Sequence, residues 1–312
     1  MTPFAFVFPG QGSQSIGMLD AWGDNPVVRQ TLAEASEVLG FDMTELIRHG
    51  PKDQLDLTAN TQPVMLTAAI ACYRAWLSET GLVPSVVAGH SLGEYSALVA
   101  AGSLTLADAL PLVRFRAQAM QDAVPVGMGA MAAILGLDAQ VVVEVCTEAA
   151  KSTGEAVEAA NFNDPRQTVI AGSQFGVNEA CELLKSKGAK RAVLLAVSAP
   201  FHSSLMRPAA ERLKELLVHV SFAEPKIPLI NNIDVVARSN VDLIRDALYR
   251  QSFGPVRWVE TVHAMRARGL NHVIECGPGK VLSGLCRRID AELVSAAVSD
   301  PNSMMEVKEM LT

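Results

Sequence analysis

The stretch Val86–Ala100 decides the fold, and it reads VVAGHSLGEYSALVA. A short apolar run ends in Gly89, Ser91 follows two residues later, and Gly93 precedes an alanine-rich helical pattern. This order predicts a strand, a tight turn and a helix, with the serine at the apex of the turn. We expect glycine on both sides because so sharp a bend brings neighbouring backbone too close for a Cβ atom.

Ser91 is the first candidate nucleophile. A turn of this kind leaves the hydroxyl projecting into open space, and the following helix presents unpaired N–H groups and the positive end of its dipole beside it. An anion that forms next to the hydroxyl would be stabilised there. The alternative is a structural serine that caps the helix in an ordinary strand-to-helix turn.

Composition and charge describe a globular protein. The chain has 312 residues, 49% hydrophobic and 19% charged, which is enough for one large domain that carries a smaller inserted one. A net charge of −7 argues against general nucleic-acid binding, since phosphate contacts need an excess of Lys and Arg. No C-x-x-C spacing is present, so we expect neither a disulfide framework nor a metal site. The cysteines are Cys72, Cys146, Cys181, Cys276 and Cys286.

The N-terminal residues lack the basic segment, apolar segment and cleavage site of an export signal. No apolar run reaches the roughly 18 residues that span a bilayer. We therefore expect a soluble cytoplasmic protein without a membrane partner.

The N-terminal segment Phe4–Phe8 is wholly apolar and stops at the loop PGQGSQ, residues 9–14. This pattern predicts a buried strand that leads into a glycine-rich loop. A dinucleotide fingerprint is one interpretation, but the third glycine is missing and no acidic residue follows at the usual distance. A second interpretation is that Gly10 and Gly12 allow close approach of a ligand, so that the backbone N–H of Gln11 faces a developing negative charge. A plain tight turn is the third.

Three further helices are expected in the first half of the chain. Residues 27–48 have an amphipathic pattern, residues 60–77 form a helix with Pro63 in its first turn, and residues 104–123 form another. The last of these contains Arg114 and Arg116. Residues two apart on a helix point in nearly opposite directions, so only one of the two arginines is able to face a given cleft.

The hydrophobic pattern of residues 129–197 differs from that of the preceding sequence and predicts an inserted subdomain. The expected order is strand, helix, strand, strand, helix, strand, which is the ferredoxin-like βαββαβ pattern. The fold class we expect is α/β: a large α/β-hydrolase-like domain with a parallel sheet core at 1–127 and 199–312, and the ferredoxin-like insert at 128–198. The expected strands are 130–135, 157–160, 168–171 and 191–196, and the expected helices are 139–150 and 176–187.

His202 follows the insert directly, in the sequence Pro200-Phe201-His202, at the edge of the cleft that the join would make. A lone histidine is usually a surface or packed residue, and a catalytic one is the alternative. Beyond it we expect a helix over 206–218, a strand over 227–230, a helix that ends within 246–253, and a final strand that begins at Val273 and turns into a helix.

Several motifs occur together and in order along the whole chain. They are PGQGSQ at 9–14, GHSLGE at 89–94, the helix with Arg116, NFN at 161–163, PFH at 200–202, Gln251 before PVRW at 255–258, and ECGPGK at 275–280. In this combination the chain closely resembles the malonyl-CoA:acyl carrier protein transacylase family, which loads malonyl units for fatty-acid biosynthesis, and the acyltransferase domains of polyketide synthases.

The resemblance implies roles for individual residues. Ser91 would attack the thioester carbonyl and hold the malonyl group as an ester, and His202 would take the hydroxyl proton and return it to the leaving thiol. The oxyanion would lie against the backbone N–H groups of Gln11 and Leu92. Arg116, rather than Arg114, would bind the free malonyl carboxylate.

We find no convincing acid between Ser91 and His202, and in the resembling family the imidazole is oriented by the main-chain carbonyl at the position of Gln251. Phe201 resembles the malonyl-type pattern, in which a bulky ring leaves little room for an α-methyl branch. The expected substrate-binding set is Arg116, Gln251, Phe201, His90 and Asn161, with Asn163 as the alternative to Asn161.

The partners implied are malonyl-CoA, whose coenzyme A thioester is a substrate rather than a cofactor, and an acidic acyl carrier protein. Two basic clusters are candidates for carrier docking: Lys185, Lys187, Lys190 and Arg191, or Arg287 and Arg288. The alternatives are a polyketide-type malonyl acyltransferase, a serine thioesterase or hydrolase, and a non-catalytic acyl-CoA sensor.

Overall fold

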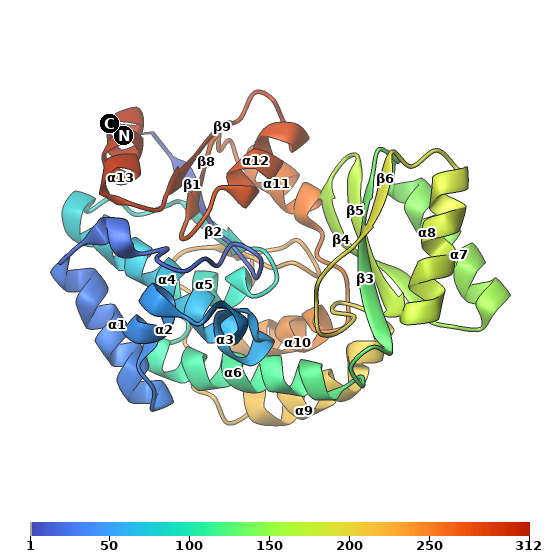
Figure 1. Ribbon diagram of the computed structural model, residues 1–312. Helices are drawn as coiled ribbons and strands as arrows, with labels where there is room; N and C mark the ends of the chain where they lie inside the picture. Colours follow the sequence, from blue (N-terminus) through green and yellow to red (C-terminus); the bar gives the residue numbers. More distant parts are fainter. Residues whose placement is uncertain (1) are drawn as a thin grey trace.

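The computed structural model describes residues 2–312 and contains two β-sheets (Figure 1). The larger sheet is parallel, with strand order β7-β2-β1-β8-β9. The smaller sheet is antiparallel, with order β4-β5-β3-β6. No helix within residues 2–312 combines the length and apolarity that crossing a bilayer would need.

The strands of the parallel sheet are β1 (Phe4–Phe8), β2 (Val86–Gly89), β7 (Leu229–Ile230), β8 (His272–Cys276) and β9 (Val294–Val298). The helices that accompany it are η1 (Asp20–Trp22), α1 (Pro26–Leu39), α2 (Met43–His49), α3 (Lys52–Asp56), α4 (Thr58–Thr80), α5 (Gly93–Ala100), α6 (Leu106–Asp122), η2 (Ser204–Met206), α9 (Arg207–Leu217), α10 (Val241–Gln251), α11 (Trp258–Ala267), α12 (Val281–Ile289) and α13 (Pro301–Leu311).

The central strand β1 is buried on both faces, as its continuous apolar run predicts. Alternate side chains point to opposite faces of a strand. Phe6 therefore packs on α4, where its ring centroid lies 5.4 Å from that of Trp76, while Val7 belongs to the opposite core with Trp258 of α11 and Leu285 of α12. Helices on both faces thus hold the carboxyl ends of β1 and β2 in fixed positions beside each other.

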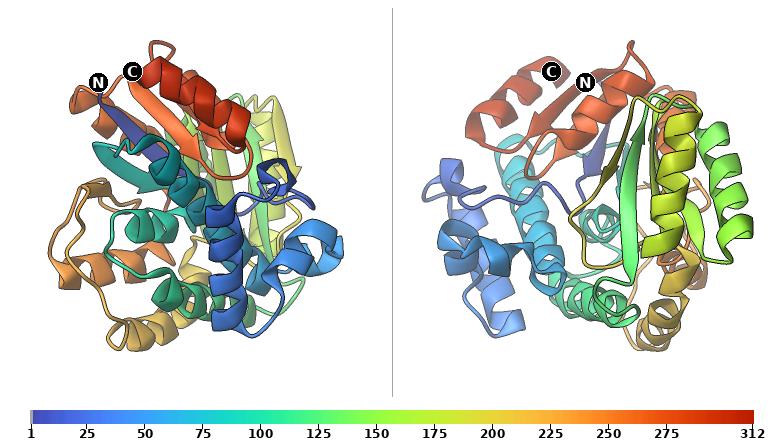
Figure 2. Two further views of the ribbon diagram at one scale, coloured as in Figure 1. Left: turned by 90° about the vertical axis from the view of Figure 1, so that its left-hand side faces the viewer. Right: turned by 45° about the vertical axis from the view of Figure 1, so that its right-hand side comes forward.

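Residues 128–198 build the second sheet from β3 (Gly129–Leu135), α7 (Ala139–Thr153), β4 (Val157–Asp164), β5 (Gln167–Ser173), α8 (Gln174–Ser186) and β6 (Arg191–Leu194). This order of strands and helices is the expected one. Helices α7 and α8 cover the face of the sheet that points away from the parallel sheet (Figures 1 and 2). The other face contributes Met131 and Val169 to a core with Phe201 and Met206, which joins the two parts of the molecule.

Two expectations about the early helices are wrong. Residues 27–48 form two helices, α1 and α2, because Gly40 ends α1 in the left-handed conformation at φ 73° and Asp42 caps α2 by accepting from the N–H of Glu45. Helix α4 begins at Thr58, so Pro63 lies inside the helix and not in its first turn. Tertiary packing offsets the hydrogen bond that a proline removes there.

The C-terminal part holds more structure than its sequence pattern predicts. The strand at residue 273 is not the last, because β9 pairs in parallel with β8 and α13 follows it. The sequence of β9, VSAAV, is rich in small residues and carries a weak strand signal, so it depends on the free edge that β8 offers. Helix α11 was likewise not expected.

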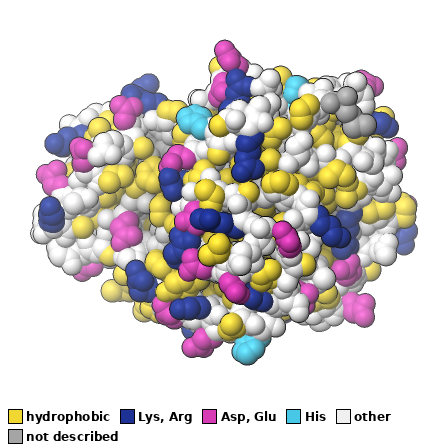
Figure 3. Space-filling model, turned by 180° about the vertical axis from the view of Figure 1, so that it is seen from behind, with side chains coloured by type: hydrophobic (Ala, Val, Ile, Leu, Met, Phe, Trp, Pro, Cys, Tyr) yellow, Lys and Arg dark blue, Asp and Glu magenta, His cyan; other side chains and the backbone are white. Residues whose placement is uncertain are grey.

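Charged side chains of both signs are interspersed on the face seen from behind, with no surface of a single sign (Figure 3). The net charge of −7 is therefore not gathered on that face. Local patches of positive charge remain compatible with the overall negative charge.

Candidate active site

Ser91 lies at the apex of the turn between β2 and α5, with a positive φ of 53°. A Cβ atom at Gly89 would overlap the backbone of Gly93, and one at Gly93 would overlap the carbonyl group of Phe8. The expectation that glycine is required on both sides is confirmed, since β1, the turn and α5 meet at distances that exclude a side chain.

The strained turn is held by Asn232, which follows β7. Its Oδ1 accepts from the backbone N–H of Ser91 at 2.7 Å, and its Nδ2 donates to the carbonyl of Gly89 at 2.6 Å. The asparagine amide therefore bridges both sides of the turn. No role for this residue was predicted from the sequence, although it is the second residue after a predicted strand, on the same sheet edge as Ser91.

His202 is the partner of the serine. Its Nε2 lies 2.6 Å from Ser91 Oγ, and its Nδ1 lies 2.9 Å from the main-chain carbonyl of Gln251 and 3.1 Å from that of Gly254. Carbonyl oxygens accept only, so Nδ1 carries the hydrogen and Nε2 is free to accept the serine proton. This is the geometry of a nucleophile and its general base.

Burial, together with the neighbouring Arg116 guanidinium, lowers the pKa of His202 to about 3. The imidazole is only 3% exposed, so its charged form is poorly solvated. The hydrogen bonds to the carbonyls of Gln251 and Gly254 act in the opposite direction. His202 is consequently neutral at physiological pH and available as a base.

Arg116 of α6 is 2% exposed and points at the serine, whereas Arg114 is exposed and donates to the carbonyl of Leu39. The Nη1 of Arg116 donates to Gln62 Oε1 at 2.8 Å, and its Nη2 lies 3.1 Å from Gln251 Oε1 and 3.3 Å from Ser91 Oγ. Among residues 2–312 no carboxylate lies within ion-pair distance of this guanidinium. A buried cation surrounded by neutral amides is suited to an anionic ligand.

A family model described as "Acyl transferase domain" matches residues 5–298. The chain belongs to this acyl transferase family. It is 50% identical over 311 residues to the malonyl CoA-acyl carrier protein transacylase of Escherichia coli K12, covering 99% of this chain and 100% of the relative. The Bacillus subtilis protein of the same name is 46% identical, covering 97% of this chain and 96% of the relative.

Solved structures of the family agree with this chain in fold. The acyl-carrier-protein S-malonyltransferase of Burkholderia pseudomallei is 62% identical with a TM-score of 0.97, covering 99% of this chain and 100% of that one. A malonyl-transacylase solved in complex with a type II polyketide-synthase acyl-carrier protein is 47% identical, also with a TM-score of 0.97, covering 99% and 100%. The mixed α/β architecture, a parallel sheet with an added antiparallel sheet, is therefore that of the acyl transferases.

The acyl transferase site opens into a cavity of about 630 Å³ that both sheets line. The parallel part contributes Gln11, Ser91 and Leu92, and the antiparallel part contributes residues of β3 to β5 and Leu195. Within residues 2–312 the backbone N–H groups of Gln11 and Leu92 donate no hydrogen bond, so both are free beside the nucleophile. Free donors in this position suit a developing oxyanion.

The remaining predicted residues also gather at this cavity. Phe201, His90 and Asn161 line it. The alternative between the two asparagines is resolved for one contact, because Asn163 Oδ1, not Asn161, lies 2.8 Å from His90 Nε2. Asn161 stays in the cavity wall, where its strand β4 bridges to Val256.

No role for Glu94 or Gln62 was predicted from the sequence. Glu94 lies 2% exposed in the first turn of α5, and burial raises its pKa to about 7. Gln62 is as buried and supports Arg116. Glu94 ends the motif at 89–94 and Gln62 stands directly before Pro63, but nothing in a single sequence distinguishes a buried polar side chain from an exposed one.

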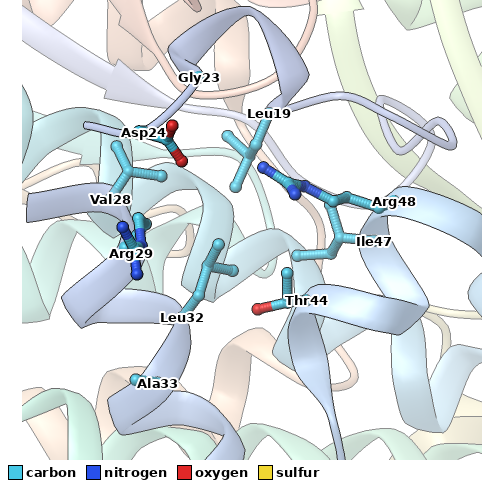
Figure 4. Close-up of a pocket in the computed structure, with 10 residues that line it drawn as sticks. All are labelled: Leu19, Gly23, Asp24, Val28, Arg29, Leu32, Ala33, Thr44, Ile47 and Arg48. Atoms are coloured by element: carbon cyan, nitrogen blue, oxygen red, sulfur yellow. The ribbon is translucent and has the colours of Figure 1, made fainter. Parts of the chain in front are cut away.

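A second cavity of about 400 Å³ lies between η1, α1 and α2, away from this site (Figure 4). Its charged groups have both signs: Asp24 and Arg29 lie on one side of the cavity and Arg48 on the other, with apolar side chains such as Leu32 between them. It contains no serine, cysteine or histidine among its lining residues. In residues 2–312 no group of three His, Cys, Asp or Glu residues is arranged to hold a metal ion.

Proposed function

We propose that the chain transfers the malonyl group of malonyl-CoA to the phosphopantetheine thiol of acyl carrier protein, in fatty-acid synthesis, through a malonyl ester on Ser91. The observation that carries this proposal is the buried Arg116 guanidinium, which has no carboxylate partner among residues 2–312 and lies 3.3 Å from Ser91 Oγ. A three-carbon acyl group that ends in a carboxylate would reach the arginine with that carboxylate while its thioester carbonyl faces the serine. Charge-assisted hydrogen bonds then select acyl groups that end in a carboxylate.

In the first half-reaction Ser91 Oγ attacks the thioester carbonyl while His202 Nε2 takes its proton. The tetrahedral oxyanion forms next to the free N–H groups of Gln11 and Leu92. Collapse breaks the C–S bond, and the imidazolium returns the proton to the coenzyme A thiolate. In the second half, the carrier thiol gives its proton to His202 and its sulfur attacks the ester carbonyl. Collapse then breaks the bond between the carbonyl carbon and Ser91 Oγ, and the imidazolium returns the proton to that oxygen.

The orienting group is neutral, because His202 Nδ1 donates to two main-chain carbonyls and not to a carboxylate. Neutral acceptors stabilise the imidazolium less than a carboxylate would. This is sufficient for a thioester, which is more reactive than an amide.

We also propose a finer classification of the fold, the absence of a cofactor, and a cellular location. The order β4-β5-β3-β6 supports a ferredoxin-like insert at 128–198, and the serine turn after a parallel strand supports an α/β-hydrolase-like domain at 1–127 and 199–312. We infer no cofactor, since the thioester itself supplies the activated acyl group. Free, buried cysteines support a reducing cytoplasm.

Intact-protein mass spectrometry tests the function. Mixing with malonyl-CoA should add one malonyl group, the adduct should be absent in Ser91→Ala, and it should move to holo acyl carrier protein on mixing. Rapid loss of the adduct to water would instead identify a hydrolase, and no adduct at all would identify a binding protein.

A further inference from the structure

Glu94 is a buried carboxyl that none of the proposed chemical steps uses. It stands three residues after the nucleophile and is 2% exposed. Its Oε2 accepts from the backbone N–H of Asn232 at 2.9 Å and from Gln251 Nε2 at 3.1 Å. Burying a carboxyl group costs free energy unless hydrogen bonds compensate it. The role of Glu94 therefore follows from its two hydrogen-bond partners.

Both partners hold catalytic groups. Gln251 accepts from Arg116 through its side-chain Oε1 and from His202 through its main-chain carbonyl. Its Nε2 also donates to the carbonyl of Ser91 at 3.0 Å. Asn232 holds the backbone N–H of Ser91. Glu94 is therefore hydrogen-bonded to the residue that holds the backbone of the nucleophile, Asn232, and to one residue, Gln251, that contacts both the base and the arginine.

The contacts of Gln251 allow only one orientation of its amide. Glu94 Oε2 and the carbonyl of Ser91 are acceptors, so both require the NH₂ group, and Oε1 then faces the Arg116 guanidinium. In the flipped orientation the amide oxygen would face two acceptors, and the NH₂ group would face the donors of the guanidinium. The ionised carboxylate makes that flip most unfavourable, because it accepts only.

We infer that Glu94 is a positioning residue that sets acyl selectivity: by fixing the Gln251 amide it holds the Arg116 guanidinium where the carboxylate of the acyl group binds. The inference rests on the proposed malonyl transfer. Loss of the Glu94 acceptors frees the amide to rotate and the guanidinium to move. Malonyl transfer then suffers more than transfer of an acyl group without a carboxylate.

The test is the rate of Ser91 acylation by malonyl-CoA and by acetyl-CoA, measured in single turnover. In Glu94→Met, kcat/KM for malonyl-CoA should fall about 10- to 100-fold, as expected when a hydrogen bond to a charged group is misplaced, with a much smaller fall for acetyl-CoA. Glu94→Gln should restore most of the malonyl rate, because its amide oxygen accepts both bonds. A folded Glu94→Met that keeps the wild-type ratio of the two rates overturns the inference.

Two further variants separate positioning from stability. Glu275→Met removes another fully buried carboxylate, which accepts from the N–H of Ser283 outside the cavity, and should lower Tm without changing the malonyl-to-acetyl ratio. Gln251→Met keeps the main-chain carbonyl for His202 and should shift the ratio as Glu94→Met does. An unchanged ratio in Gln251→Met overturns the inference even where Glu94→Met does not fold. A wild-type protein without a malonyl adduct would overturn the proposed function instead.

Discussion

At the scale of single residues, we expect Arg116 to decide which acyl group the site accepts. Replacing it with Ala should lower kcat/KM for malonyl-CoA about 10²- to 10³-fold, the range expected when one partner of a buried, hydrogen-bonded charge pair is removed. Acetyl-CoA should lose far less, because its acyl group has no carboxylate. Parallel steady-state kinetics with the two thioesters measure the difference.

Arg114→Ala is the matched control, since Arg114 stands two residues away on α6 with its side chain exposed. It should leave both rates unchanged. Equal losses for both thioesters in Arg116→Ala would show that the arginine supports Ser91 and does not read the carboxylate.

His202 and Glu94 give opposite contributions to the pH dependence of stability. The pKa of His202 is lowered to about 3 by burial, so between about pH 6.5 and 3 the unfolded chain binds a proton that the folded one does not, and stability is lost as pH falls. The pKa of Glu94 is raised to about 7 by burial, so between about pH 7 and 4.5 the folded chain binds the extra proton, and stability is gained as pH falls. In the wild type these slopes offset each other.

Replacing either residue should leave only the pH dependence of stability that the other one contributes. Urea unfolding from pH 7 to 4.5 should show that His202→Gln gains stability relative to wild type as pH falls, while Glu94→Gln loses it, by about 1.4 kcal/mol per pH unit at most. Parallel curves for the wild type and both variants would contradict this assignment of protons.

More of the residues that line the candidate site were predicted from the sequence than of the buried polar residues that hold them in place. Ser91, His202, Arg116 and Gln11 carry motif signals, and the structure brings them to one cavity. Glu94, Asn232 and Gln62 were missed, because their roles arise from contacts such as that between Glu94 and Asn232, which are 138 residues apart. A hydrogen bond over that separation leaves no local pattern.

At the scale of elements, the turn between β2 and α5 depends on backbone packing. Gly93→Ala would place a methyl group on the carbonyl of Phe8, where β1 cannot withdraw without losing its register with β2 and β8. The expected result is a loss of more than about 3 kcal/mol of unfolding free energy, or an insoluble protein. Chemical denaturation measures it.

Gly284 supplies the control. It lies in the interior of α12, and a Cβ there would meet only the end of the Arg288 side chain, at 3.6 Å. Gly284→Ala should therefore gain up to about 1 kcal/mol from helix propensity. A Gly93→Ala protein of wild-type stability would show that the turn relaxes and that its geometry is not enforced by packing.

Helices and strands with a strong local sequence pattern were predicted. Those whose position depends on contacts with neighbouring elements were not. The apolar run of β1 was sufficient to predict that strand, and the alternating patterns in residues 129–197 were sufficient to predict the strands and helices of the insert. The helix break at Gly40, the start of α4 and the strand β9 were not, because a cap, a packed proline and a free sheet edge decide them.

At the scale of the whole molecule, the cavity exists because two sheets meet. Pro200 leads from the insert to His202, and the other face of the antiparallel sheet packs on the core around Phe201. The nucleophile and the base thus come from opposite sides of the insert in sequence. Motif order suggested this join, but the pairing of β4 with Val256 that closes it is visible only in three dimensions.

Charge at this scale opposes the proposed partner, because the chain carries −7 and the carrier implied by the resemblance is acidic. Attraction must come from a local patch. The cluster Lys185, Lys187, Lys190 and Arg191 lies where β6 begins, and Arg191 is about 13 Å of extended strand from Leu195 in the cavity wall. Arg288 of the other cluster is already paired with Asp164.

Reversing Lys187 and Lys190 to Glu should therefore raise KM for the carrier about 5- to 10-fold at low salt, with KM for malonyl-CoA unchanged, and the effect should shrink as salt screens the charges. Arg287→Glu is the matched control on α12. The kinetics of malonyl transfer at low and high ionic strength distinguish the clusters: a rise in carrier KM in Arg287→Glu alone would move the docking surface to α12. Equal KM values in all three proteins would show that carrier docking does not depend on either cluster.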